Sequence, residues 1–413
     1  MFRNYLLSAY KVFMRRKLFT AINLVCIVLT LVVLMVVTAM LENAFFPSGV
    51  EGKSNRFLQV VVLRMQSADR SNISGSPLGY KLIETYLKPL KSPELVAAVT
   101  MPGTVSVYQD GRVTELQMRR ADANYWKILD FTLLWGRFPT AQDDEQGRFV
   151  AVINKSTADK LFDAGNALGK TVSVSGQQLR VIGVVEDELH LNASGDLWAP
   201  ITTFASSAYR ERLAGSFVAL LLARSADDLP QIQAEVKAIA KQVQLDDPKK
   251  FSHAYFWADT KIQAMARMTL GDADVEDSGA SLMVTVLAGA MLLFMLLPAL
   301  NLVNLNTGRI LERSSEIGVR KAFGATSAQL VWQLVVENVL LCLVGGAIGL
   351  LFAAGVLAWL ESSGLVPYMK VNMNFAILGY GLLITLVFGL LSGALPAWKM
   401  SRLDPVHALK GAI

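Results

Sequence analysis

Residues 18–41 read LFTAINLVCIVLTLVVLMVVTAML and contain no charged side chain. The run is 24 residues long and is bracketed by Lys17 and Glu42. An α-helix needs about 20 apolar residues to cross roughly 30 Å of hydrocarbon at about 1.5 Å per residue. The stretch therefore predicts a membrane-spanning helix, and it is too long for the apolar region of a cleaved signal peptide.

Three further runs without a charged residue repeat this pattern, at 278–308, 338–360 and 371–398. Hydrophobic residues make up 53% of the 413-residue chain and charged residues only 18%, and the apolar excess is concentrated in these runs. Helices buried in soluble proteins are usually much shorter. We therefore predict a membrane protein with four transmembrane helices, at 18–41, 281–308, 331–360 and 371–398.

Basic residues indicate the side of the membrane that each connection faces. Residues 1–17 contain five Lys or Arg and no acid, in a pattern typical of an amphipathic helix on the membrane surface. Residues 42–280 contain 26 Lys or Arg against 29 Asp or Glu, so the formal net charge of +5 comes from the other segments. Because cytoplasmic loops carry the basic excess, both termini are expected inside and residues 42–280 outside. The charge requires no nucleic-acid partner.

The segment 42–280 has the pattern of a large mixed α/β domain. Its two strand–helix units flank a β-rich insert at about 110–200. The two cysteines of the chain, Cys26 and Cys342, lie in predicted spans, so no disulfide is expected here. Apolar periodicity predicts strands at 57–63, within 96–107, and at 150–153, 171–174, 179–185 and 217–222, with helices at 77–90, 156–162 and 229–243.

The connection at 309–330 has the pattern of two helices joined by an elbow. Glu316 and Arg320 are spaced i, i+4 with the acid first, which is the favourable order. Gly324 is suited to end a helix. Thr326 and Gln329 have the spacing of a capping box for the next helix.

Three apolar residues lie in this elbow: Ile317, Val319 and Phe323. The segment is predicted to face the cytosol, where apolar side chains need a partner. They either pack on the chain's own helices or dock into another protein, and the sequence leaves both interpretations open.

Two of the predicted spans contain glycines four residues apart, Gly345 with Gly349 and Gly389 with Gly393. This spacing lets two helices approach closely. Packing within the chain is the preferred interpretation, and dimerisation is the alternative.

The elbow also carries a recognisable signature. The sequence EIGVRKAFGA at 316–325, with Gln329-Leu330 and Glu337 following, resembles the signature of the MacB/FtsX-like permeases of ABC transporters. The outer segment and the tail at 396–409 are similar to the same family. The matching motifs of the outer segment, which look like a MacB-type periplasmic core, are Tyr125-Trp126, Leu134-x-Gly136-Arg137, Val150–Asn154, Leu161-Phe162, Gly169-Lys170 and Val181–Val185.

The resemblance implies a permease subunit whose outer domain has Porter-like and Sabre-like parts. It implies a dimer with a second permease subunit, either identical or different, and a separate cytoplasmic ATPase that uses ATP and Mg. The permease itself would bind no cofactor and would be surrounded by membrane lipids. The elbow would be the coupling helix, with ATPase-coupling residues Glu316, Ile317, Gly318, Arg320, Lys321, Phe323, Gly324 and Ala325.

The expected location is the bacterial inner membrane, with a multi-pass chain. The segments are a cytoplasmic amphipathic helix at 1–17, a first span at 18–41, a periplasmic core domain at 42–280, a second span at 281–308, a coupling helix at 309–330, a third span at 331–360, a short periplasmic loop at 361–370, a fourth span at 371–398 and a cytoplasmic tail at 399–413.

No catalytic constellation is found in the sequence. The three histidines, His190, His253 and His407, are scattered, and none has a second ligand at metal-binding spacing. The acidic run 186–188 is interpreted as a solvated loop. Residues 165–171, GNALGKT, lack the spacing of a phosphate-binding loop and are interpreted as a tight turn. We therefore predict a protein without enzymatic activity of its own.

Two functions fit this prediction. In the first, the subunit couples ATP hydrolysis by its partner to export of a substrate from the periplasm or the outer leaflet, with an adaptor and an outer-membrane duct as further partners. The alternative is a transmembrane mechanotransmitter that regulates an envelope hydrolase or a peptide-sensing signalling system.

Overall fold

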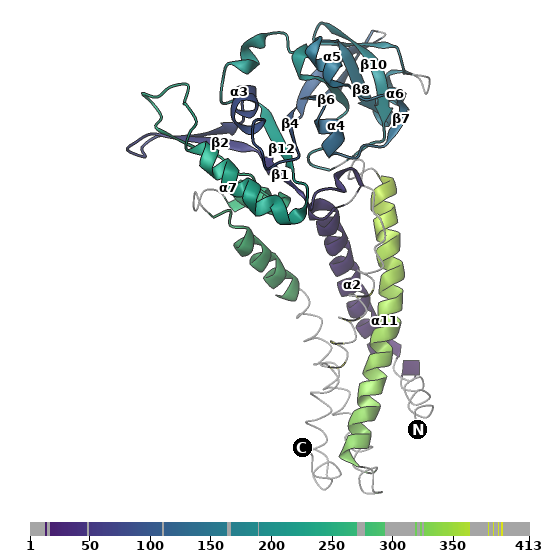
Figure 1. The fold of residues 1–413 in the computed structure, drawn as a ribbon. Helices are drawn as coiled ribbons and strands as arrows, with labels where there is room; N and C mark the ends of the chain where they lie inside the picture. The colour runs from purple at the N-terminus through teal and green to yellow at the C-terminus, as the bar shows by residue number, and fades with distance from the viewer. Residues whose placement is uncertain are drawn as a thin grey trace. The chain divides into compact units, whose positions relative to one another are not determined.

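The computed structural model describes residues 13–14, 17–47, 49–109, 111–162, 167–188, 190–270, 277–293, 319, 323, 326–363, 379, 383, 387 and 390. These residues form the coloured ribbon of Figure 1. The chain divides into two compact units. One contains most of α2 (Lys17–Phe45) and α11 (Ser327–Ser363), and the other, which we call the head, contains Asn43–Met283.

Two helices of the described part are long and apolar enough to cross a membrane. Their apolar stretches are Thr20–Leu41 in α2, with mean hydropathy 3.1, and Val335–Ser363 in α11, with mean hydropathy 2.5. A shorter apolar helix covers Ala280–Leu293. Most of the predicted second and fourth spans, 281–308 and 371–398, lies outside the described residues. Four spans therefore remain a prediction.

The glycine pair of α11 packs against α2. A Cβ atom on Gly345 would lie 2.8 Å from Cγ2 of Ile27, and one on Gly349 would lie 3.2 Å from Cβ of Leu31. Ile27 and Leu31 share a buried cluster with Leu341 and Cys342. The interpretation of this glycine pair as packing within the chain is confirmed. The pair Gly389 and Gly393 lies outside the described residues.

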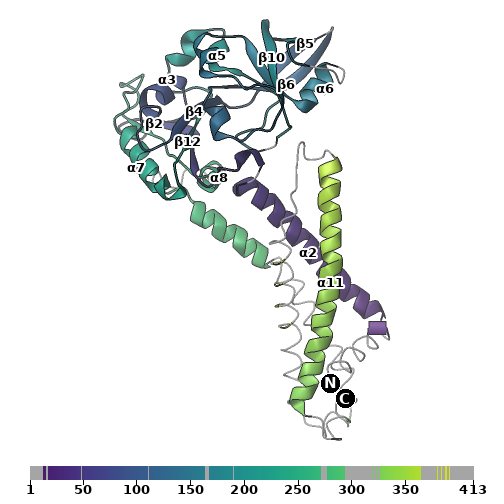
Figure 2. The same ribbon diagram turned by 45° about the vertical axis from the view of Figure 1, so that its right-hand side comes forward.

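The head is built on a ten-stranded sheet and a three-stranded sheet, shown in two views 45° apart in Figures 1 and 2. The order in the larger sheet is β1-β12-β4-β6-β11-β8-β10-β9-β5, with β7 paired to β10, and the smaller sheet has the order β13-β2-β3. The strands are β1 (Phe57–Val60), β2 (Val62–Gln66), β3 (Ile73–Pro77), β4 (Leu95–Thr100), β5 (Gly103–Gln109), β6 (Arg112–Ala121), β7 (Leu133–Gly136), β8 (Val150–Asn154), β9 (Thr171–Val174), β10 (Gln177–Val185), β11 (Leu197–Pro200), β12 (Phe217–Leu222) and β13 (His253–Tyr255).

Short helices connect these strands. The first, η1, follows α2 in the chain, and the last, α8, precedes the apolar helix Ala280–Leu293. They are η1 (Gly49–Glu51), α3 (Tyr80–Leu82), η2 (Ile83–Leu87), α4 (Tyr125–Ile128), α5 (Ala141–Glu145), α6 (Lys155–Leu161), η3 (Ile201–Thr203), η4 (Ser207–Arg210), η5 (Ala226–Asp228), α7 (Leu229–Ala240) and α8 (Lys261–Leu270).

Part of the larger sheet closes into a barrel. β5 pairs with β6 as well as with β9, so the strands β6-β11-β8-β10-β9-β5 form a ring. Apolar side chains of these strands share one core, which includes Val107, Leu116 and Val181. The predicted insert at about 110–200 corresponds to this barrel, which already begins at Gly103. The sequence pattern places the closing strand β5 in the preceding unit, because closure depends on pairing with β9, which is distant in sequence.

Two predicted elements differ from the structure because residues distant in sequence pair with them. The predicted strand at 57–63 is two strands, because β1 pairs with β12 while β2 belongs to the smaller sheet. The predicted helix at 77–90 begins only at Tyr80, since the backbone N–H groups of Leu78 and Gly79 donate to the carbonyls of Phe217 and Leu213.

The motif Gly136-Arg137 leads into a buried acid. The Asp143 carboxylate is fully buried, and it accepts hydrogen bonds from the Arg137 guanidinium at 2.6 and 3.1 Å. It also forms a capping box with Thr140 at the start of α5. The Arg137 hydrogen bonds lower the pKa of Asp143 from its model-peptide value, against an opposing effect of burial.

A depressed carboxyl pKa stabilises the head above the unfolded-state pKa of 3.8, and this contribution is lost as the pH falls below that value. We expect Asp143→Asn to destabilise the head at pH 7 and to reduce its loss of stability between pH 5 and pH 3. Urea unfolding at the three pH values measures both effects. Parallel curves for the variant and the wild type would contradict the assignment.

Candidate functional site

The elbow is the first part of the candidate site. Of its eight predicted coupling residues, the structure describes Phe323, whose side chain is 88% exposed. Its backbone N–H donates to the carbonyl of Val319 at 3.1 Å, and Val319 is 44% exposed. Phe323 therefore does not pack into a core of this chain. The other predicted residues lie outside the described residues: Glu316, Ile317, Gly318, Arg320, Lys321, Gly324 and Ala325.

A capping box fixes the point where α11 starts. The Thr326 N–H donates to Oε1 of Gln329 at 3.1 Å, and the Gln329 N–H donates to Oγ1 of Thr326 at 3.3 Å. These reciprocal bonds satisfy two N–H groups that a helix start leaves without partners. The predicted capping box is confirmed, and α11 begins at Ser327, four residues after Phe323.

Polar residues lie buried in the first turns of α11. The Gln333 amide donates to Oε1 of Glu337 at 3.1 Å, and both side chains are buried, as is that of Asn338. Glu337 lies within the apolar stretch Val335–Ser363. Ionisable side chains in such stretches are costly unless they have partners within the protein. This turn of α11 therefore needs a protein environment and is unsuited to face lipid.

The second part of the candidate site is a buried ion pair between Glu51 and Lys261. We call the region of the head around these two residues its base. Glu51 ends η1, just after α2, and Lys261 begins α8, the last helix described before the apolar helix Ala280–Leu293. Lys261 Nζ lies 2.5 Å from Oε2 of Glu51, and their side chains are 6% and 0% exposed. The N–H and side-chain amide of Asn192 both donate to Oε1 of Glu51, at 3.0 and 3.1 Å. The pair thus connects the segment that follows α2 with the start of α8.

A second ion pair holds α8 to the same base. Arg267 Nε lies 2.8 Å from Oδ2 of Asp259, and the Arg267 guanidinium lies 4.2 Å from the ring centroid of Trp257. Burial raises the pKa of Asp259, and the charge of Arg267 opposes this shift. Asp259 and Gln59 exchange two backbone hydrogen bonds, of 2.8 and 2.9 Å. The start of α8 is therefore attached to strand β1.

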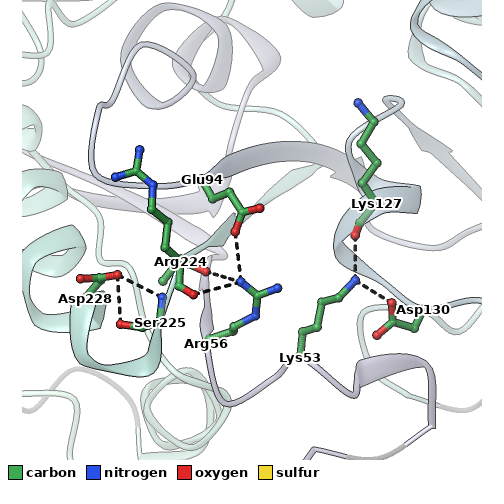
Figure 3. Close-up of polar contacts among 9 residues, drawn as sticks. Lys53, Arg56, Glu94, Lys127, Asp130, Arg224, Ser225 and Asp228 are labelled. Carbon is green, nitrogen blue, oxygen red and sulfur yellow. Dashed lines mark hydrogen bonds and ion pairs between the residues drawn. The ribbon is translucent and has the colours of Figure 1, made fainter.

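More exposed contacts hold the segment after η1, as Figure 3 shows. Lys53 Nζ donates to Oδ1 of Asp130 at 2.6 Å and to the carbonyl of Lys127 at 3.0 Å. Arg56 pairs with Glu94 at 3.0 Å and also donates to the carbonyls of Ala223 and Arg224. This segment is thus fixed to β4, α4 and the end of β12.

No sequence pattern indicates the pair Glu51–Lys261. The two residues are 210 positions apart, and each looks like an ordinary surface charge in its local sequence. Only Lys261 stands out in the sequence, because it is the first residue of an amphipathic helix that precedes an acidic linker. The pairing itself depends on the fold.

Two loops of the head carry residues of types that could take part in chemistry. The prediction of a solvated loop at 186–188 is wrong for Glu188, which is buried and lies 3.1 Å from Nδ1 of His190. The prediction of a turn is supported at Gly169, which has φ +79° and donates to the carbonyl of Val181. Within the described residues, no group of three or more His, Cys, Asp or Glu is placed to hold a metal ion.

Comparison with known proteins identifies the family. Residues 20–239 match the MacB-like periplasmic core domain, and residues 288–405 match the FtsX-like permease C-terminal domain. The chain belongs to the MacB/FtsX-like family of ABC transporter permeases. The match to the MacB-like periplasmic core covers the head as far as residue 239, and the elbow and α11 lie within the FtsX-like part.

Relatives of this MacB/FtsX-like permease include a protein named as a permease and proteins named as ATP-binding/permease proteins. It is 25% identical over 326 residues to the uncharacterized ABC transporter permease YknZ of Bacillus subtilis, covering 78% of this chain and 77% of YknZ. It is 25% identical over 305 residues to the macrolide export ATP-binding/permease protein MacB of Mannheimia succiniciproducens, covering 73% of this chain and 44% of MacB. The chain thus spans less than half of that MacB protein.

A solved structure is similar to part of the permease. The extracellular domain of YknZ from Gram-positive bacteria is 22% identical, and the match covers 48% of this chain and 98% of that domain. The TM-score of 0.38 is too low to show a shared fold.

Proposed function

We propose that this permease converts ATP hydrolysis by a separate cytoplasmic ATPase into movement of the head, and that this movement drives export of a substrate from the periplasm or the outer leaflet. The permease works as a dimer in the bacterial inner membrane, with both termini in the cytoplasm and the head outside. It binds no cofactor itself, because ATP and Mg belong to the partner.

The buried pair Glu51–Lys261 is the observation that best supports this function. The pair joins η1, which follows α2, to the start of α8, the last helix described before the apolar helix Ala280–Leu293. A displacement of either connecting helix would therefore reach the same rigid base. Two independent flexible attachments would absorb such a displacement. The relative MacB is named as a macrolide export protein, and this favours export over the regulatory alternative.

The exposed Phe323 supports the elbow as the contact to the ATPase. An 88% exposed phenylalanine next to a capped helix start is suited to enter an apolar pocket of another protein. We propose that Phe323 docks there while Glu316, Arg320 and Lys321 fix its orientation by charge. Ile317, Gly318, Gly324 and Ala325 complete the proposed contact.

The elbow is tested with the complex purified from native membranes and reconstituted in lipid nanodiscs. We expect Glu316→Gln or Arg320→Gln to leave membrane insertion intact and to reduce ATP-dependent head movement at least tenfold. Phe323→Ala should weaken binding of the ATPase. Head movement is measured by energy transfer between fluorophores on the two heads of the dimer, and ATP hydrolysis is measured in the same sample.

Arg402→Gln is the matched control, because it also removes a positive charge from a predicted cytoplasmic segment but lies outside the elbow. The Arg402→Gln complex should show the same ATP-dependent head movement and the same rate of ATP hydrolysis as the wild type. Normal ATP-dependent movement in the elbow variants would refute their proposed role.

Proteins that co-purify with the complex distinguish export from regulation. An adaptor and a duct support export, and a hydrolase or sensor kinase supports regulation.

A further inference from the structure

The outer edge of strand β13 is open. On its other side β13 pairs with β2, from His253 opposite Gln66 to Tyr255 opposite Arg64. Among the described residues β13 is the last strand of the smaller sheet, and no strand pairs with its outer side. The backbone N–H and C=O groups on that side therefore have no strand partner. An open edge of this kind can take up a strand from another chain.

A cavity of about 380 Å³ lies beside this edge. Its lining includes the consecutive residues Ser252–Trp257 and no residue of β2 or β3. Because successive side chains of a strand point to opposite faces, a cavity that touches all of these residues lies along the outer edge of β13 and not on one face of the sheet.

The opposite wall of the cavity is the end of α7 with the residues that follow it. Ala240, Lys241 and Val243 line the cavity from this side. In Figures 1 and 2, α7 and β2, the strand that pairs with β13, lie side by side. The open edge and the helix end thus form the two walls of one groove, which we call the β13 groove.

The floor of the β13 groove is apolar. Ala240, Ala254 and Phe256 line the cavity, are buried, and belong to one core cluster of the head. Tyr255 and Trp257, which alternate with Ala254 and Phe256 along the chain, are half-buried. An apolar side chain that enters the groove would be removed from water, which is favourable.

An exposed cation lies at the mouth of the β13 groove. Lys241 directly follows the buried Ala240, and it forms no ion pair with any residue that the structure describes. None of the residues that line the cavity is acidic. The first acid after Lys241 in the sequence is Asp246, whose carboxylate accepts from Lys81 Nζ at 2.7 Å. An acidic side chain beside the open edge would therefore meet an uncompensated positive charge.

We propose that the β13 groove binds an extended peptide segment of another protein, which adds to the smaller sheet as a further strand. The peptide backbone pairs with the outer edge of β13. Its apolar side chains pack on Ala240, Ala254 and Phe256, and an acidic side chain on its other face meets Lys241. Strand addition obtains affinity from backbone hydrogen bonds and specificity from pockets for alternate side chains. This inference goes beyond the transport function and needs no ATPase, so the two are tested separately.

Binding is measured by calorimetry on the full chain in phosphatidylcholine nanodiscs, with the peptide acetyl-Ser-Val-Asp-Val-Thr-Val-amide as the probe. In an extended chain the N–H groups of the valines point to one edge, and those of the three polar residues point to the other. One control peptide is N-methylated on its valines, and a second is N-methylated on its polar residues. We expect their affinities to differ at least tenfold, because an added strand pairs through only one of its edges.

Lys241→Glu tests where the peptide lies. This exposed substitution should weaken binding of the probe about fivefold, and it should strengthen binding of a peptide in which Lys replaces Asp. Lys249→Glu is the matched control variant, since Lys249 is an exposed lysine of the same head outside the cavity lining. It should leave the affinities for both peptides at their wild-type values.

Equal affinities of the two N-methylated peptides would overturn the proposal, as would equal effects of the two lysine variants. Absence of saturable binding to the wild type would also overturn it, including the case in which a second copy of this chain already fills the groove. A probe with photo-leucine in place of its central valine locates the peptide directly. Cross-links to Ser252–Trp257 support the β13 groove, and cross-links to β3, at the opposite edge of the smaller sheet, would overturn it.

Discussion

Lys261→Met is expected to lower the free energy of unfolding of the head by about 3–5 kcal/mol, because it leaves the buried carboxylate of Glu51 without its counter-charge. Glu51 is fully buried, and its remaining hydrogen-bond partners would be the N–H and amide of Asn192. These neutral donors do not replace a charge, and the Arg119 guanidinium, which also interacts electrostatically with Glu51, donates hydrogen bonds to backbone carbonyls instead. Urea unfolding of the full chain in nanodiscs, followed by tryptophan fluorescence, measures the loss.

Two control variants separate this ion pair from a general effect of losing a lysine. Lys53→Met removes a lysine from the more exposed pair with Asp130, whose side chains are 29% and 48% exposed. Exposed pairs contribute about 0–1 kcal/mol, so its effect should be small. Adding Glu51→Gln to Lys261→Met should restore much of the stability, because the amide oxygen still accepts from Asn192 and needs no counter-charge. Equal midpoints for Lys261→Met and Lys53→Met would contradict the buried pair.

Gly136→Ala is expected to prevent stable folding of the barrel, at a cost of more than about 4 kcal/mol. Gly136 has φ +84°, and a Cβ atom there would lie 2.1 Å from the carbonyl oxygen of Ile182 and 2.7 Å from Cδ2 of Leu168. The carbonyl belongs to the backbone of β10, so β7 would have to leave its partner strand. Expression yield and resistance of the head to protease measure the outcome.

Gly176→Ala is the matched control for this variant. Gly176 has φ +82°, almost the same as Gly136, but no atom lies within 4 Å of its added Cβ. Its alanine variant measures the cost of the left-handed conformation alone, which is about 1–2 kcal/mol. If both variants unfold at the same urea concentration, the close approach of β7 to β10 is not what requires glycine.

The elements that the sequence predicts well are those set by local pattern. The strand at 171–174 has the predicted bounds, because its alternation and the following Ser175-Gly176 turn act within a few residues. The strand at 217–222 is equally local, since its six residues form an uninterrupted apolar run that is buried along its whole length. The capping box of Thr326 and Gln329 is also a short-range device.

The features that the sequence did not predict depend on distant partners. Closure of the barrel requires β5 to meet β9, and the pair Glu51–Lys261 requires the two ends of the head to meet. Neither is encoded in a periodicity or a motif. For the elbow, the sequence left open whether Phe323 packs within this chain or docks into another protein. Its side chain is 88% exposed, so packing within this chain does not explain it.

Barrel closure has a consequence for a protein that is expected to work as a pair. An open strand edge can capture a strand from another molecule, and two copies held together in one complex would meet at high local concentration. The ring of β6-β11-β8-β10-β9-β5 has no such edge, and backbone bonds between Gln59 and Asp259 occupy part of the outer edge of β1. The barrel therefore offers no strand edge through which two heads could exchange strands, and such edges are found in the smaller sheet, at β3 and β13.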